Sequence, residues 1–216
     1  MKVGTDAVLL GCCAQADNPN LILDIGTGSG LIALQLAQRF SNALVHGIEI
    51  DPEAAAQAER NFNTSPWKNR MLCFSEDVLI WQNAVKYDLI VCNPPFYPSS
   101  FPIADNQRVW ARTHATLNFE SLAVQADRLS GEQAWFWYVL PSHVENTLAL
   151  LLRSKGWHLR EVIHVSPKLG NAPHRTIAGW SKTAGPENQQ QLYIRSASGN
   201  YTSAYLELTR DFYLFA

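Results

Sequence analysis

The amino-acid sequence predicts an α/β protein in which helices cover both faces of a mostly parallel, seven-stranded sheet. Two observations support this prediction. Short apolar runs typical of buried strands alternate along the chain with segments typical of helices, and this alternation is characteristic of a parallel sheet. A glycine-rich loop, residues 26–30, joins the first apolar run to the first helical segment, at the place where open α/β sheets bind ligands.

The first part of the chain supplies four strands and two helices. Leu21–Ile25 is a short apolar run closed by glycines, and residues 31–40 contain good helix formers without a breaker. Pro52 suits the first turn of a second helix, which the alanines at 54–56 support. The predicted strands here are residues 21–25, 43–50, 71–74 and 87–92.

The second part of the chain supplies three further strands. Residues 97–117 are rich in proline, serine and polar groups and are predicted to form a long, functional loop over the sheet. Helices are predicted at 118–129 and, behind a Ser142–Glu145 capping box, up to about residue 155. The predicted strands are 134–140, 159–166 and 203–209, and residues 185–191 are predicted to form an exposed hairpin or loop tip.

Length and composition indicate one globular domain over residues 1–216. Hydrophobic residues make up 47 % of the 216 residues and charged residues 17 %, which excludes a disordered chain. No apolar stretch approaches the roughly 20 residues of a membrane span, and Met1–Asp6 lacks the apolar core of a signal peptide. We therefore expect a cytoplasmic protein, monomeric and without membrane partners.

The four cysteines indicate neither a metal site nor a disulfide framework. Cys12, Cys13, Cys73 and Cys92 include no Cys-x-x-Cys pair. Buried free thiols are the expected state, and no metal is predicted.

The charge is distributed unevenly along the chain. Residues 1–150 carry 9 Lys/Arg and 15 Asp/Glu, a net of −6, whereas residues 151–216 carry 8 and 4, a net of +4. The positive charge is densest in 153–182, where six cations meet one acid, Glu161. This segment is either a solvated surface or a contact surface for an anionic partner.

The glycine loop predicts a ligand at the end of the first strand. Asp24, Gly26, Gly28 and Gly30 form the pattern Asp-x-Gly-x-Gly-x-Gly, in which glycines let a ligand approach the main chain closely. The fingerprint of a dinucleotide-binding loop is Gly-x-Gly-x-x-Gly, without an acid in the preceding strand. This sequence differs in both respects. The observed spacing is common in S-adenosylmethionine enzymes.

Acids at the ends of the next two strands fit an adenosine. A carboxylate at Glu49 can accept hydrogen bonds from both ribose hydroxyls, because its two oxygens are pure acceptors. Asp51, beside Pro52, is better explained as a helix N-cap. After the third strand, Asp77 can accept from an adenine amino group while the N–H of Val78 reads the ring, although spacing leaves Glu76 as an alternative to Asp77.

The fourth strand ends in Asn93-Pro94-Pro95-Phe96, which suits a planar amino group. The prolines fix an extended backbone, so that the amide oxygen of Asn93 and the carbonyl of Pro94 can accept both hydrogens of one –NH₂ group. Holding both hydrogens frees the nitrogen lone pair to attack a methyl group. Phe96 offers a ring face for stacking on a base. Such a site works mainly by positioning its substrate.

The loop residues 24–30 together with Asn93–Phe96 resemble the class I S-adenosylmethionine-dependent methyltransferases that modify exocyclic or amide nitrogens. Residues 1–11, 93–97, 111–112 and 166–168 look specifically like the bacterial tRNA1(Val) adenine-37 N6-methyltransferases. The resemblance implies a Rossmann-like fold, S-adenosylmethionine as cofactor and methylation of N6 of the adenine beside the anticodon. It also implies a contact of Thr5 with the methionine end of the cofactor and a short segment upstream of Met1.

Cationic residues are the candidates for contacts with tRNA. They are Arg108, Arg112, Lys168 and Arg175, with His114 in the same long loop. Three alternatives remain at this point: a protein glutamine N5-methyltransferase, because the Asn-Pro-Pro-aromatic device suits any planar –NH₂ group; N6-adenine methylation of another RNA or of DNA; and a binding module without catalysis.

Overall fold

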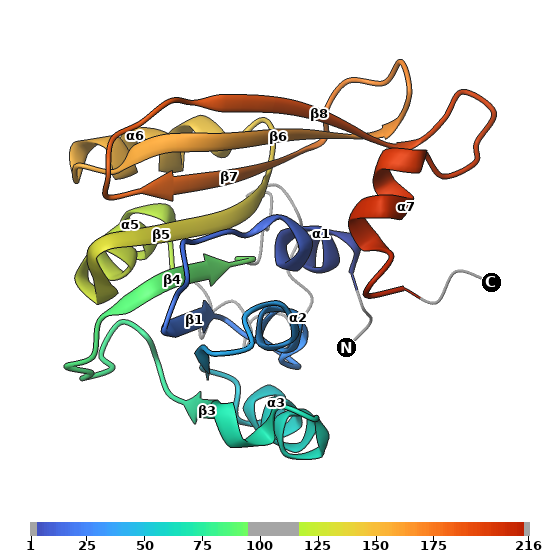
Figure 1. Cartoon of the computed structure of the whole chain (residues 1–216). Coiled ribbons are helices and arrows are strands. Elements are labelled where there is room, and N and C mark those ends of the chain that lie inside the picture. Colours follow the sequence, from blue (N-terminus) through green and yellow to red (C-terminus); the bar gives the residue numbers. More distant parts are fainter. Residues whose placement is uncertain (1–3, 95–116, 214–216) are drawn as a thin grey trace, which may run out of the picture.

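Eight strands form one sheet in the computed structural model, which describes residues 4–94 and 117–213 (Figure 1). The order across the sheet is β3-β2-β1-β4-β5-β7-β6-β8. The first five strands of this order are parallel, β7 is antiparallel to both of its neighbours, and β6 and β8 are parallel. The strands are β1 (Leu21–Ile25), β2 (Leu44–Glu49), β3 (Met71–Ser75), β4 (Tyr87–Cys92), β5 (Ser130–Pro141), β6 (His158–Lys168), β7 (Arg175–Ser181) and β8 (Asn188–Arg195).

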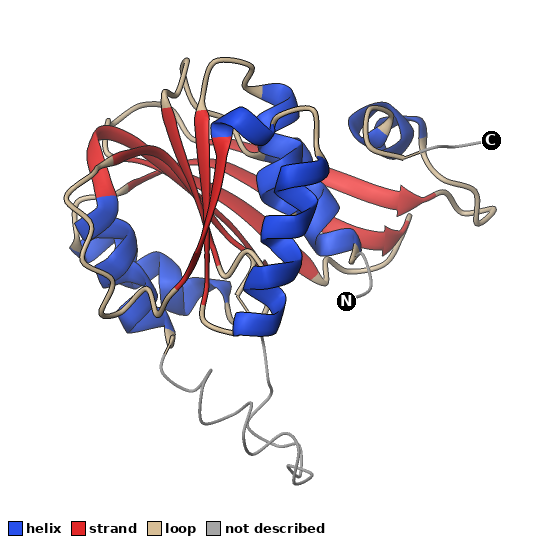
Figure 2. Ribbon diagram, turned by 90° about the horizontal axis from the view of Figure 1, so that it is seen from below, coloured by secondary structure: helices blue, strands red, loops and turns tan. Residues whose placement is uncertain are grey.

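Helices cover both faces of this sheet, as the alternation predicted (Figure 2). One layer contains α1, α2 and α3, with α7 against α1, and the other contains α5 and α6. The helices are α1 (Thr5–Cys13), α2 (Leu31–Arg39), α3 (Pro52–Thr64), α5 (Phe119–Leu129), α6 (Glu145–Ser154) and α7 (Ser203–Thr209), with a short 3₁₀ helix, η1 (Lys68–Arg70). The mostly parallel α/β fold is therefore confirmed.

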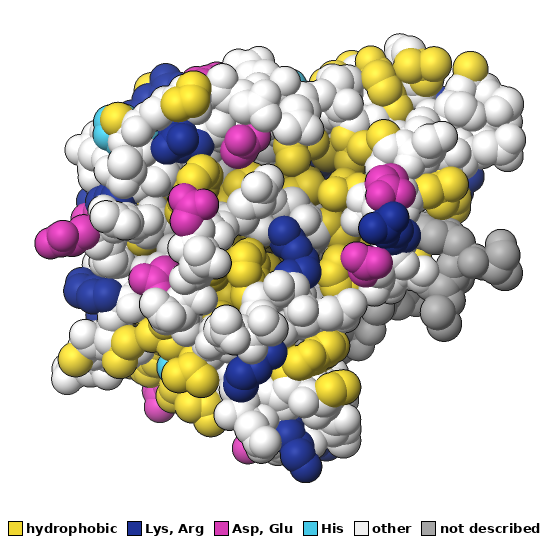
Figure 3. All heavy atoms as spheres, viewed as in Figure 1, with side chains coloured by type: hydrophobic (Ala, Val, Ile, Leu, Met, Phe, Trp, Pro, Cys, Tyr) yellow, Lys and Arg dark blue, Asp and Glu magenta, His cyan; other side chains and the backbone are white. Residues whose placement is uncertain are grey.

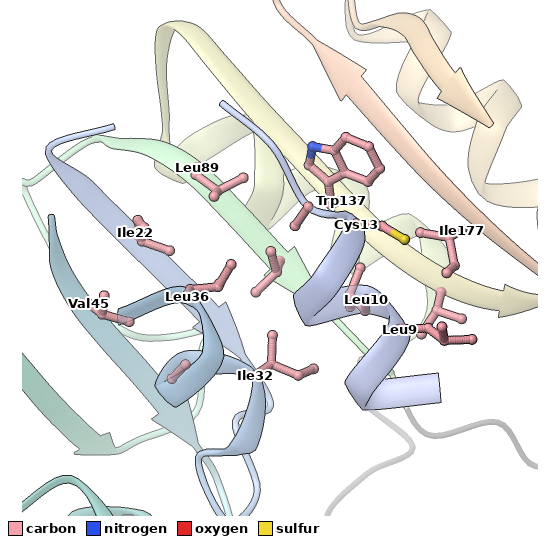
Figure 4. Packing of buried hydrophobic residues seen from close by; sticks show 14 of the residues in the cluster. Leu9, Leu10, Cys13, Ile22, Ile32, Leu36, Val45, Leu89, Trp137 and Ile177 are labelled. Carbon is pink, nitrogen blue, oxygen red and sulfur yellow. The ribbon is translucent and has the colours of Figure 1, made fainter. Parts of the chain in front are cut away.

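Each face of the sheet has its own apolar core. Figure 4 shows the core under α1 and α2, to which Leu10 of α1, Leu36 of α2, Val45 of β2 and the ring of Trp137 from β5 all belong. The opposite core includes Trp157 and lies under α5 and α6. Burying each large apolar side chain contributes about 1.5–3 kcal/mol. These two cores fix the helices against the sheet and thereby the loops between them.

The strand register places the predicted site residues at one edge of the sheet. Ile25 of β1 is level with Ile48 of β2 and with Cys92 of β4. Because these strands are parallel, the segments that follow them leave the sheet side by side. The glycine loop, Glu49 and Asn93 therefore meet at this edge.

The prediction of a strand at 203–209 was wrong, because this segment forms α7. Its buried residues are Tyr205 and Thr209, which are four apart and so share one face of a helix. The side chain of Thr202 caps the helix by accepting from the N–H of Tyr205. The alternation of Leu206, Glu207 and Leu208 imitated a strand, and Thr202 was the signal that identifies a helix.

The sheet has eight strands instead of the predicted seven, because the strand expected at 203–209 is absent and two strands, β7 and β8, form within residues 167–200, where no strand was predicted. Residues 188–191, predicted as part of a hairpin or loop tip, begin β8. Their side chains are all exposed, and among the described strands β8 pairs only with β6, at the edge of the sheet. A polar edge strand carries no apolar alternation for the sequence to reveal.

The predicted capping box before α6 was also wrong. The N-cap of α6 is Val144, which makes no side-chain cap. Ser142 instead accepts from the hydroxyl of Thr176 at 3.1 Å, and Glu145 accepts from the hydroxyl of Tyr138 at 3.1 Å. Both polar side chains therefore connect to strands of the sheet.

Three of the four cysteine thiols, those of Cys12, Cys13 and Cys92, are buried, and the thiol of Cys73 is half-buried. All four are free, as predicted. Within residues 4–94 and 117–213, no helix is long and apolar enough to cross a bilayer.

Candidate active site

A tight loop follows β1 and turns the chain into α2. Gly26, Gly28 and Gly30 have φ angles of +69°, +57° and +85°, a region that glycine adopts at little cost. The N–H groups of Gly26 and Thr27 both donate to the carbonyl of Ile48, at 2.9 and 3.1 Å. The loop is thus tied to the end of β2.

The side chain of Asp24 stabilises this loop through two hydrogen bonds. Its Oδ2 accepts from the hydroxyl of Thr27 at 2.7 Å and from the N–H of Ala33 in α2 at 3.2 Å. Its Oδ1 is buried without a hydrogen-bond partner among the described residues. Burial raises the pKa of Asp24 from 3.8 to about 7, and the negative charge of Glu49 adds to the rise, against the opposing effect of the two hydrogen bonds. Thr27 received no role from the sequence, although it stands three residues after Asp24 and can bond to it.

Glu49 is the last residue of β2 and contacts the glycine loop. Its Oε2 accepts from the N–H of Gly28 at 2.8 Å, and its Oε1 accepts from the N–H of Asp51 at 3.0 Å. Each oxygen keeps a second lone pair, which suits the two hydroxyls of a ribose. Asp51 caps α3 by accepting from the N–H of Glu53 at 3.0 Å, so its predicted N-cap role is confirmed.

Asp77 and Val78 lie in the turn after β3. The N–H of Glu76 donates to the carbonyl of Glu49 at 3.0 Å, which joins this turn to the end of β2. Asp77 Oδ1 accepts from the N–H of Leu79 at 2.9 Å and is half-buried, whereas Glu76 is exposed. The second oxygen of Asp77 has no such bond to the turn, so the proposed contact with an adenine stays a prediction.

Asn93 and Pro94 follow β4 directly beside the glycine loop. Cys92 is level with Ile25, so Asn93 and Gly26 are the next residues of two adjacent parallel strands. Asn93 is half-buried and Pro94 is buried. The structure thereby brings together the two segments that the sequence singled out independently. Phe96, Arg108, Arg112 and His114 lie outside the described residues.

The first turn of α1 also lies on this side of the molecule. Gln35 of α2 donates to the carbonyl of Val8, and Arg39 donates to the carbonyl of Gly11. Residue numbers rise together in the two helices, so α1 and α2 point in the same direction. Thr5 is therefore level with the start of α2, where the glycine loop ends, as its predicted role requires.

The basic segment 153–182 is divided between two ends of the sheet, because β6 and β7 pair Val165 with Arg175 at one end and Leu159 with Trp180 at the other. Arg153 lies over the ring of Trp180, and Arg160 lies over the ring of Trp135. Lys182 pairs with Asp127. On the face that Figure 3 shows, Lys and Arg side chains are scattered among Asp and Glu. The sequence left open whether this segment is one contact surface, because linear charge density carries no information about where in the fold each residue lies.

The two predicted tRNA contacts in this segment differ in their surroundings. Arg175 Nε donates to Asp6 Oδ2 at 2.7 Å, an ion pair that joins β7 to α1. Its Nη1 donates to the carbonyl of His174 at 3.0 Å. Lys168 is exposed at the end of β6.

The site fits S-adenosylmethionine. An added Cβ at Gly26 would meet no atom of the described residues within 4 Å, so the loop backbone leaves space among them for a ligand to approach. Glu49 offers fixed acceptors to one side of that space. Among the described residues, no group of three His, Cys, Asp or Glu side chains could hold a metal ion.

Comparisons with known proteins agree with this geometry. Residues 3–113 match the family model of the methyltransferase small domain. The tRNA1(Val) (adenine(37)-N6)-methyltransferase of Escherichia coli O1:K1 is 42 % identical over 218 residues, which cover 100 % of this chain and 89 % of the relative. The protein of the same name from Shigella sonnei is 43 % identical over the same shares of the two chains.

Solved structures share the fold. A predicted O-methyltransferase from Agrobacterium tumefaciens superimposes with a TM-score of 0.74 at 17 % identity, over 98 % of each chain. A methyltransferase from Pyrococcus furiosus gives a TM-score of 0.57 at 19 % identity, over 82 % of this chain and 81 % of that one. With the glycine loop, the acid at the end of β2 and the family match, the chain belongs to the methyltransferase small domain family, among the class I S-adenosylmethionine-dependent methyltransferases.

Proposed function

We propose that this protein methylates N6 of adenine 37, next to the anticodon, in tRNA1(Val). The observation that carries the proposal is the position of Asn93 and Pro94 beside the glycine loop, in a chain 42 % identical over its full length to proteins named for this reaction. We place the enzyme in the cytoplasm, where tRNA is modified, and expect it to act as a monomer.

In this proposal the cofactor is held by the loop and by the strand ends beside it. S-adenosylmethionine supplies the activated methyl group when it is bound. Glu49 accepts from the ribose hydroxyls, Asp77 and Val78 contact the adenine ring, and Thr5 contacts the methionine end. The positive φ angles of the loop favour glycine, and because glycine has no Cβ, these three residues leave the path of the cofactor clear.

Asn93 and Pro94 orient the adenine. The amide oxygen of Asn93 and the carbonyl of Pro94 accept one hydrogen each from the N6 amino group, which turns the nitrogen lone pair toward the methyl group. Phe96 stacks on the base. The amine loses its proton only after attack, so the chain needs no strong base and works by holding the two reactants in line.

The test uses purified protein, S-adenosylmethionine labelled in its methyl group, and tRNA from a strain that lacks the modification. We expect label in N6-methyladenosine of tRNA1(Val) after digestion to nucleosides. Cofactor binding without any label in tRNA would contradict the proposal and direct the search to protein glutamine.

A variant pair tests the role of the amide. Asn93→Ala should abolish methyl transfer and leave cofactor affinity nearly unchanged, because the amide is proposed to hold the substrate amine. Asn146→Ala removes the same group from an exposed position on α6 and serves as the control. Equal loss of transfer and of cofactor binding in Asn93→Ala would count against the proposed role.

A further inference from the structure

Two exposed cations stand side by side where β6 and β8 end. Lys168 and Arg195 are in register across this parallel pair, one strand spacing of about 4.8 Å apart. Both side chains are exposed. Neither forms an ion pair with an acid among the described residues. We refer to these two residues as the strand-end pair.

Arg195 is held in place by its own surroundings. Its Nη1 donates to the carbonyl of Gly199 at 2.7 Å, and its guanidinium carbon lies 4.2 Å from the centroid of the Tyr201 ring. Tyr201 in turn stacks on Tyr205 of α7 at 5.0 Å between centroids. The N–H of Leu169 donates to the carbonyl of Arg195 at 2.8 Å, which fixes the two strand ends to each other. Most of the five N–H donors of the guanidinium are not used by these contacts.

Among the described residues, no acid offsets the charge of this pair, in contrast to the charges of three other cations. Arg175 is paired with Asp6, Lys182 with Asp127 and Arg210 with Glu207. Two like charges in neighbouring positions of a sheet repel each other, and an anion between them removes the repulsion. A planar guanidinium with an ammonium beside it suits the oxygens of a phosphate.

We infer that Lys168 and Arg195 bind a phosphate of the tRNA backbone, an inference that rests on the proposed function. Arg195 has no assigned role in the sequence-based prediction, and the structure pairs it with Lys168 through the register of β8. The contact fixes the orientation of the tRNA without reading a base.

The register also shows how far this phosphate lies from the reacting adenine. Asn93 follows β4, and β8 is four strands away, about 19 Å across the sheet. Cys92 is level with Tyr138, Ala178 and Val162 in turn, so Lys168 extends five residues, or about 16 Å, beyond the level of Asn93. The bound phosphate therefore belongs to a part of the tRNA several nucleotides away from adenine 37.

The test compares two double variants of the full chain. Lys168→Gln with Arg195→Gln removes the strand-end pair. Arg60→Gln with Lys68→Gln removes the same charge from exposed positions at α3 and η1, near the β3 edge of the sheet. The binding of unmodified tRNA1(Val) is measured between 50 and 200 mM salt, and the rate of methyl transfer is measured over a range of tRNA concentrations up to saturation.

Each lost phosphate contact should lower the slope of log affinity against log salt by about 0.7–0.9. For the one phosphate that the pair binds, the gain in affinity between 200 and 50 mM salt should shrink about threefold in the strand-end variant. Its KM for tRNA should rise and its kcat should stay unchanged, because the pair acts far from the reacting atoms. The control variant should keep the slope of the wild type.

Two results would overturn the inference: a strand-end variant with the slope of the wild type, or a control variant with an equally reduced slope. Arg195→Lys, which keeps the charge, should restore most of the slope if the site binds phosphate. Failure of the wild type itself to methylate tRNA would instead refute the proposed function, so the two failures are distinguishable.

Discussion

Asp24 should make the protein less stable as the pH rises from 5 to 8, and Asp24→Asn should remove this effect. The carboxyl group is fully buried, and burial raises its pKa from 3.8 to about 7. A group whose pKa is raised on folding stabilises the folded state at low pH, and this contribution is lost as the pH rises toward the folded pKa.

The magnitude follows from the two pKa values. The pKa of Asp24 differs by about three units between the unfolded and folded chain, which corresponds to about 4 kcal/mol in total. Between pH 5 and pH 8, about 2 to 3 kcal/mol of this is lost, because the unfolded chain is already ionised while the folded chain ionises only near pH 7.

The assay is urea unfolding of the cofactor-free protein, followed by tryptophan fluorescence at pH 5, 6, 7 and 8. Wild type and Asp24→Asn are measured at each pH, so that contributions common to both proteins cancel. The asparagine keeps the shape and can still accept from Thr27 and Ala33, and any penalty for its amide is the same at every pH.

The stability of Asp24→Asn relative to wild type should rise by about 2 to 3 kcal/mol from pH 5 to pH 8. A constant difference across this range would show that Asp24 ionises normally in the folded protein, and would refute the reasoning from burial.

Three further predictions concern other parts of the structure. Gly179→Ala should destabilise the protein by about 1–3 kcal/mol in urea unfolding, because the added Cβ would lie 2.5 Å from two ring carbons of Trp137; an unchanged midpoint would show that the ring can move. Asp51→Ala should cost about 1 kcal/mol by the same assay, since it removes the cap on the N–H of Glu53, whereas Asp51→Asn should cost less. Native protein at pH 8 should react slowly with a thiol reagent, first at half-buried Cys73, because burial raises the pKa of this thiol to about 11; rapid modification of all thiols without denaturant would contradict the burial.

The sequence by itself determined the α/β class, the strands that line the site and the identity of the cofactor loop. These features follow from local causes. Glycines at Gly26, Gly28 and Gly30 meet a backbone requirement that other residues meet poorly, and buried parallel strands need continuous apolar runs. The segment Asn93-Pro94 was recognisable because its constraint lies within two residues.

Only the tertiary structure decided which cations pair with an acid and which do not. The sequence grouped Arg175 with Lys168 as basic residues, but folding brings Asp6 to Arg175 across 169 positions and places Arg195 beside Lys168. Folding likewise brings the carboxylate of Asp24 to the hydroxyl of Thr27, and it packs residues 203–209 as a helix against α1. Charge pairing, burial and the polar edge strand β8 depend on which segments meet in space, and linear spacing does not carry that information.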